Sequence, residues 1–201
     1  VHAEGTVDRF EYNNYLYQNI RLDGNYTPRS INGKCTVDDP NIQIELEGNA
    51  QIEKVEKDIQ LKASIRDFSP QETHLSNQWK DARFSADIET ILKGSNLNNV
   101  QGFFHVRDFS MKTLEEHYEL DQLEVQTGFD EGIHYLLLNS DFANAEIRGE
   151  FDYQTLSQSF TNFIASKLQT LPGLPQVNPN THNNFSISAT IKKSDWLKQL
   201  T

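Results

Sequence analysis

Apolar and polar residues alternate with a period of two along most of the chain. This period is typical of β-strands, because successive side chains of a strand point to opposite faces of its sheet. The clearest example is the segment 41–48, in which the apolar residues are Ile42, Ile44 and Leu46. Such a strand has one dry face and one wet face, as antiparallel sheets allow.

The same alternation recurs over the segments 59–66, 84–89, 133–137 and 185–192. Turn signals separate the strand patterns, at Asp23-Gly24, Asn32-Gly33, 38–41 and 94–96. A change of phase within 120–125 predicts a β-bulge. We therefore expect a mainly β protein, a curled or taco-like antiparallel sheet of about ten strands with one amphipathic helix near the C-terminal end.

The expected helix covers 153–171, where the apolar residues follow a helical spacing. These residues are Leu156, Phe160, Phe163, Ile164, Leu168 and Leu171. Pro172 and Gly173 end the pattern. Because its polar face carries Gln, Ser and Asn, the helix does not resemble a cationic helix of a membrane surface.

The chain is predicted to form one continuous β-structure. We expect a first β unit over 1–66, a polar connecting loop over 67–81, a second β unit over 82–152 and the helix over 153–171. A loop, the last strand and a short turn beginning near Ser194 follow over 172–201. Residues 1–5 already fit the inside of a strand pattern, so we expect the chain to be part of a longer protein.

Composition narrows the function. The formal net charge of −11 argues against a nucleic-acid partner and against adsorption to anionic lipid by charge. Cys35 is the only cysteine, so neither a disulfide nor a cysteine zinc site forms within the chain. No apolar run of about 18 residues predicts a membrane-spanning helix.

No group of residues predicts catalysis, a cofactor or a metal site. The six histidines are scattered, and His105 and His134 fall on expected polar faces of strands. Asp38, Asp39 and Asn41 lack the spaced carboxylates of a calcium loop. Pairs of carboxylates suited to glycoside hydrolysis remain open, but the 29 acidic residues would produce such pairs by chance.

The predicted helix is too small to cover the predicted sheet. A helix of about 18 residues is roughly 27 Å long and cannot shield about ten strands. The remaining apolar faces must therefore meet each other, another part of the parent protein, or an apolar ligand. Two arrangements stay open, an ordinary closed sandwich core and a trough suited to hydrocarbon.

Three stretches of the chain resemble the TamB-type proteins of Bacteroides-like bacteria, which belong with the AsmA-like, bridge-type proteins. The stretches are Gly5–Gly24, Asn32-Gly33 followed by Val37–Gly48, and Leu138–Phe151 with the helix after it, and the resemblance covers essentially the whole chain. It implies a periplasmic segment of a long β-gutter anchored in the inner membrane. The implied function is phospholipid transport to the outer membrane, outer-membrane protein assembly, or both. The membrane anchor and terminal domain typical of the family are not in this sequence.

The resemblance brings no catalytic residues, and the feature it implies is an apolar interior. The implied partners are phospholipid acyl chains, the rest of the full-length chain and an outer-membrane assembly protein of the Omp85 type. The residues expected to line the interior are Ile42, Ile44, Leu46, Ile59, Leu61, Ile65, Phe84, Ile88, Phe104, Val106, Ile133, Tyr135, Leu137, Phe185, Ile187 and Ile191.

A second hypothesis is a surface-exposed β-module that binds glycan or protein. Tyr12, Tyr15 and Tyr17 would then form an aromatic platform for a sugar. The alternative for these tyrosines is packing between neighbouring strands, which any sheet favours.

Overall fold

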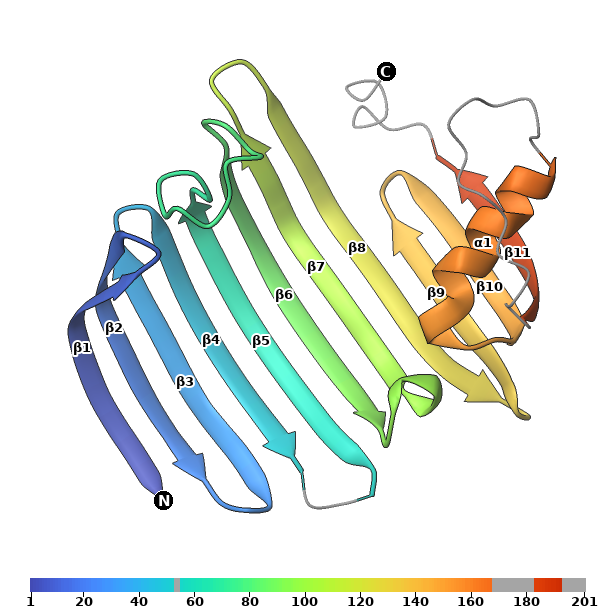
Figure 1. Ribbon diagram of the computed structural model, residues 1–201, viewed down its shortest axis with the longest axis horizontal. Coiled ribbons are helices and arrows are strands. Elements are labelled where there is room, and N and C mark those ends of the chain that lie inside the picture. The colour runs from blue at the N-terminus through green and yellow to red at the C-terminus, as the bar shows by residue number, and fades with distance from the viewer. Residues whose placement is uncertain (53–54, 168–182, 193–201) are drawn as a thin grey trace.

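The computed structural model describes residues 1–52, 55–167 and 183–192. Eleven strands form one antiparallel sheet in which the order of strands follows the order of the chain (Figure 1). The sheet is open and curled, which confirms the predicted mainly β, taco-like fold. The strands are β1 (His2–Tyr12), β2 (Tyr15–Tyr26), β3 (Ser30–Asp39), β4 (Ile42–Gln51), β5 (Lys57–Phe68), β6 (Arg83–Gly94), β7 (Gln101–Lys112), β8 (His117–Asp130), β9 (Ile133–Ser140), β10 (Ala143–Glu150) and β11 (Asn184–Ile191).

Two predicted turns lie where expected and two do not. The turn at 40–41 joins β3 to β4, and Gly94 leads into the short 3-10 helix η1 (Leu97–Asn99). Asp23-Gly24 and Asn32-Gly33, however, lie inside β2 and β3. Their glycines permit a close approach of two strands, because a Cβ at Gly33 would lie 2.7 Å from the carbonyl oxygen of Asp23.

Strand pairing divides the side chains into two faces. Residues paired directly across two antiparallel strands lie on the same face. Ile44 pairs with Val37 and with Ile65, and the apolar partners continue from strand to strand in both directions. We call this side the apolar face. The opposite side, which carries Glu47, Lys62 and their partners, is the charged face.

The predicted change of phase in β8 is present, and it is shared with β7. The pairing of β6 with β7 shifts between Ser85 and Asp87, close to Asp108, whose φ is 49°. The rings of Phe84 and Phe109 lie 6.3 Å apart. The bulge thus keeps large side chains on the apolar face across the irregularity, as a strand with an extra residue does.

The segment 69–82, close to the predicted loop 67–81, joins β5 to β6 and closes one end of the apolar face. Its Thr73 is fully buried, and the hydroxyl of Tyr17 donates to the Thr73 carbonyl at 3.3 Å. Asp39 is 1% exposed beside it. Its carboxylate accepts hydrogen bonds from the Tyr15 hydroxyl and from the amides of Gln18 and Asn41, at 2.5, 3.1 and 2.9 Å.

Helix α1 (Tyr153–Lys167) lies over β9, β10 and β11 (Figure 1). Asp152 caps its start, since the carboxylate accepts from the amide of Gln154 at 2.7 Å. The helix was predicted to reach residue 171, but 168–171 lie outside the described residues, as does the predicted turn after Ser194. Within the described part of the chain, no helix has the length and apolar character needed to cross a membrane.

Replacing Asp39 should destabilise the fold. Asp39→Ala would leave two backbone amides and a tyrosine hydroxyl without their buried acceptor, which predicts a loss of about 3 kcal/mol in the free energy of unfolding. Urea denaturation followed by circular dichroism measures this loss. Asp38→Ala, on the exposed neighbour, is the matched control, and equal losses in the two variants would contradict the assignment.

Candidate functional site: an uncovered apolar sheet face

Within residues 1–52, 55–167 and 183–192, no second layer covers most of the apolar face. Among the described residues, the buried apolar side chains are Ile42, Ala82, Leu120, Phe151 and Leu156. Large apolar side chains on this face remain open to water. Leu22 is 48% exposed, Ile31 47%, Ile59 41% and Phe104 39%. The described residues therefore form no closed sandwich, and the trough is the arrangement that the fold presents.

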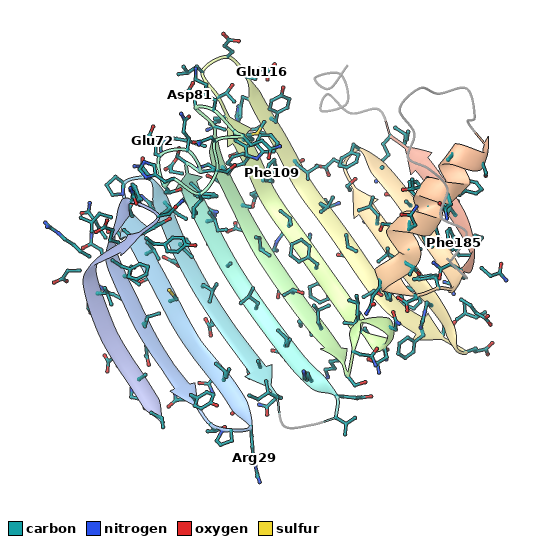
Figure 2. All side chains as sticks on the ribbon, in the orientation of Figure 1. Arg29, Glu72, Asp81, Phe109, Glu116 and Phe185 are labelled. Atoms are coloured by element: carbon teal, nitrogen blue, oxygen red, sulfur yellow. The ribbon has the colours of Figure 1, made fainter. Side chains whose placement is uncertain are left out.

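The structure places most of the predicted interior residues together on the apolar face. They come from five strands, β4 to β7 and β11, which belong to one continuously paired sheet. These residues are Ile42, Ile44, Leu46, Ile59, Leu61, Ile65, Phe84, Ile88, Phe104, Val106, Phe185, Ile187 and Ile191. Figure 2 shows Phe185 beside α1 and Phe109 near the segment 69–82, at opposite regions of the same face.

Three predicted interior residues are wrong: Ile133, Tyr135 and Leu137 lie on the charged face. The sequence is apolar at both alternating positions from Tyr135 to Leu138, so periodicity alone does not tell which set faces inward. The structure turns Tyr135 against the guanidinium of Arg148, 5.6 Å from its ring centre. That contact is a cation–π interaction.

Sequence reasoning also missed part of the apolar face. Strand pairing places the missed residues on the same face as the predicted ones. Pairing the strands of each hairpin around its correct turn would have identified them. They are Ile20, Leu22, Ile31, Cys35, Val37, Leu123, Val125, Leu136, Leu138, Ala145 and Ile147.

A row of glycines deepens the face over β2, β3 and β4. Gly24 pairs with Gly33, and Gly33 pairs with Gly48, so three adjacent strands present no side chain at one level. A groove of about 460 Å³ follows this row. Its apolar lining comes from both sides of the glycines: Leu22, Tyr26, Ile31, Cys35, Leu46, Ala50, Ile59 and Leu61.

Burial raises the pKa of the Cys35 thiol in this lining. The thiol therefore stays protonated at neutral pH and behaves as a small apolar side chain rather than as a nucleophile. Cys35 is half-buried, and its cross-strand neighbours on the face are Leu22 and Leu46. This thiol therefore adds no negative charge to the groove.

The charged face is organised as a ladder of alternating charges. One row of directly paired residues crosses seven strands: Asp23, Lys34, Glu47, Lys62, Glu89, His105 and Glu124. Lys34 approaches Glu47 at 3.2 Å, and Lys62 approaches Glu89 at 3.2 Å. Cross-strand pairs of opposite charge favour this register, although each exposed pair contributes little by itself.

The two histidines assigned to polar faces have different surroundings. His105 lies on the charged face as predicted, and its Nε2 is buried without a hydrogen-bond partner among the described residues. His134 was predicted to lie on a polar face, which is wrong, because it pairs with Gly149 on the apolar face. It lies under the start of α1, where its Nδ1 is 2.9 Å from the carbonyl oxygen of Phe151.

Tyr15 and Tyr17 pack against the closed end of the sheet. Their ring centres are 4.8 Å apart in an edge-to-face arrangement. Burial raises the pKa of both phenols, and both hydroxyls donate to groups within the chain. Tyr12 alone of the three is largely open, at 57% exposure. The structure therefore does not assemble the three rings into one platform.

Acidic residues near the site do not gather around a common point. Among the described residues, no group of three or more His, Cys, Asp or Glu is placed to hold a metal ion. The Asp39 carboxylate, which sequence reasoning considered for calcium, already accepts three hydrogen bonds from its own surroundings.

Filling the groove should weaken its binding of apolar molecules. A Cβ at Gly48 would lie 3.2 Å from a terminal methyl of Leu61, which is free to shift, so Gly48→Val should fold. Loss of space for one or two methylene groups predicts about tenfold weaker binding of a fluorescent apolar probe. Asn49→Val adds the same side chain to the opposite face, and an equal effect there would count against the groove.

Alkaline pH should loosen the contact between α1 and the sheet. Burial raises the pKa of Tyr153 above its ordinary value of 10.0. Below pH 10.0 the Tyr153 phenol is neutral in both the folded and the unfolded chain, so its full contribution to the free energy of unfolding is present. As the pH rises through the higher pKa of the folded state, this contribution is lost. Denaturation curves at about pH 9 and about pH 11 should differ less for Tyr153→Phe than for the unchanged chain. Identical pH dependence in both proteins would contradict this role.

No protein-family model, curated protein or solved structure matches the chain. Its function is therefore inferred from the chemistry of the two faces of the sheet.

Proposed function

We propose that this chain is a non-catalytic, periplasmic segment of a TamB-like envelope protein. Its apolar face would carry phospholipid acyl chains between the inner and outer membranes, serve outer-membrane protein assembly through the same surface, or do both. The observation that carries this proposal is the uncovered apolar face, with side chains such as Leu22 and Ile31 nearly half exposed. The resemblance of the sequence to the TamB family supplies the compartment and the direction.

Contact with hydrocarbon would remove the unfavourable exposure of apolar side chains to water. Transfer of an acyl chain from water to an apolar surface is favourable by about 0.8 kcal/mol for each buried methylene. The same contact removes water from the exposed side chains of the protein face. Burial of apolar surface is favourable for both the lipid and the protein, so passive binding needs no further chemistry. The polar head group would remain in water.

The charged face confines a lipid to one side of the sheet. Its ion pairs include Arg66 with Asp87 at 2.8 Å and Lys93 with Asp58 at 3.3 Å. An acyl chain would have to desolvate these charges to bind there, which is unfavourable. The sheet therefore offers hydrocarbon a single face, as a gutter open along one side does.

The direction of the groove favours movement along the sheet. The glycine row crosses β2, β3 and β4 at right angles to the strands. Neighbouring strands lie about 4.8 Å apart, so an acyl chain in the groove would pass over a new strand every few methylenes. Each strand then offers a similar apolar contact, and no single site holds the chain tightly.

The net charge of −11 bears on how lipid would enter. A strongly acidic protein is not drawn to an anionic membrane surface by charge. Loading and release would therefore depend on the expected partners, which are the rest of the full-length chain and an outer-membrane assembly protein.

Photo-crosslinking in living cells tests the proposal. A photoreactive residue replaces Ile44, Leu61 or Ile187 on the apolar face of the full-length parent protein. We expect lipid adducts at these positions, because each side chain would contact acyl chains. Mass spectrometry of the crosslinked protein identifies the adducts.

Matched controls lie one residue away in the sequence. Gln43 and Lys62 belong to the same strands but point to the charged face, so photoreactive residues there should give no lipid adduct. Absence of lipid adducts at all five positions would sink the transport proposal. The hypothesis of a glycan- or protein-binding module would then take its place.

A further inference from the structure

The two outer strands of the sheet differ in how they are protected against pairing with another chain. Edge strands of soluble proteins usually carry charges, proline or bulges that discourage such pairing. β1 carries Glu4, Asp8, Arg9 and Glu11. β11 has the sequence NFSISATI, with no charged residue, proline or glycine. No described strand pairs with its outer edge.

Along its outer edge, the backbone of β11 presents a regular row of hydrogen-bonding groups with which no described strand pairs. The amide of Lys192 donates to the carbonyl of Phe142, next to β10, at 2.8 Å. Because antiparallel residues alternate in the direction of their backbone groups, Ser188 and Thr190 also face β10. Ile187 and Ala189 therefore direct their amides and carbonyls away from the sheet.

We infer that this edge pairs with β11 of a second copy of the chain, which forms a twofold dimer with one continuous sheet. A twofold axis perpendicular to the sheet makes the two β11 strands antiparallel and keeps both apolar faces on the same side. With the axis at Ser188, Ile187 lies opposite Ala189, and Ser186 lies opposite Thr190. Apolar side chains then meet apolar ones, and hydroxyls meet hydroxyls.

The other edge fits this role less well. In a sheet whose neighbours are all antiparallel and in chain order, β1 and β11 run in the same direction. Joining β11 to β1 of another copy with the apolar faces aligned would give a parallel pair, which is slightly less stable per residue. It would also bring the charged side chains of β1 against an uncharged strand.

Helix α1 supplies a second reason for a partner at this edge. Leu156, Phe160 and Phe163 lie on one stripe of the helix, and their exposure rises from 8% to 41% and 50% along it. Figure 1 shows α1 crossing the strands obliquely toward the β11 margin. The second half of the helix thus reaches a region where the described sheet ends. β11 of a second copy would extend the surface beneath it.

Analytical ultracentrifugation of the chain, from micromolar to millimolar concentration, tests the dimer. We expect a monomer–dimer equilibrium. Ala189→Pro removes an outward amide and leaves the hydrogen bonds to β10 intact, so it should weaken the dimer by about tenfold or more. Ser188→Lys places two charges at the axis and should act in the same direction. Circular dichroism confirms that each variant folds, and Ser188→Lys carries the test if the proline variant does not.

Thr6→Pro and Thr6→Lys are the matched controls. Val1 exchanges backbone hydrogen bonds with Tyr26, so by alternation Thr6 directs its amide away from the sheet, as Ala189 does. Neither control substitution should change the dissociation constant of the dimer. A chain that is monomeric at every concentration overturns the inference, and so does a dimer that survives both β11 variants. Dissociation by the Thr6 variants, or by Leu61→Glu on the apolar face alone, also overturns it. None of these outcomes bears on lipid crosslinking to the apolar face.

Discussion

A single-layer sheet satisfies its backbone by hydrogen bonds between strands, but it provides no second layer for its apolar side chains. That constraint explains the rest of this molecule. Cohesion lies within the plane of the sheet, in the ladders between neighbouring strands and in side-chain pairs across them. Helix α1 covers the apolar face at one region, and the segment 69–82 closes another. Between them the described residues leave the face open, with large apolar side chains exposed to water.

The charged face, on the opposite side of the sheet, is exposed to water. Its row of alternating charges fixes which strand position lies beside which, because a slip of one residue would exchange the two faces. Within this row His105 pairs with Glu89 on one side and with Glu124 on the other. The charges also prevent a second sheet from packing on this side. The same strands thus carry an apolar surface on one side and a charged surface on the other.

The local period of two was sufficient to predict strands, but not always to predict which of their side chains point to the apolar face. The pattern of Ile42, Ile44 and Leu46 gave the correct inward set because its alternate positions are polar. In the run from Tyr135 to Leu138 both sets are apolar, and the choice depends on the partner strands, which are distant in sequence. Gly24 and Gly33 were mistaken for turn residues for a related reason. A glycine needed for close contact between strands has the same sequence signature as a glycine needed for a turn. The groove could therefore be recognised only after strand pairing was known.

The order of strands has a consequence for how such a protein changes in size. Each described strand pairs through backbone hydrogen bonds with its neighbours in the chain, so the molecule resembles a linear array with nearest-neighbour energetics. Insertion or deletion of one hairpin would leave every other pairing unchanged and would keep the two faces in phase. Evolution can thus adjust the span of the structure in increments of one hairpin by duplication, without redesigning a central core. Length is a freely variable trait in this architecture, whereas in a globular domain it is bound to the packing of the interior.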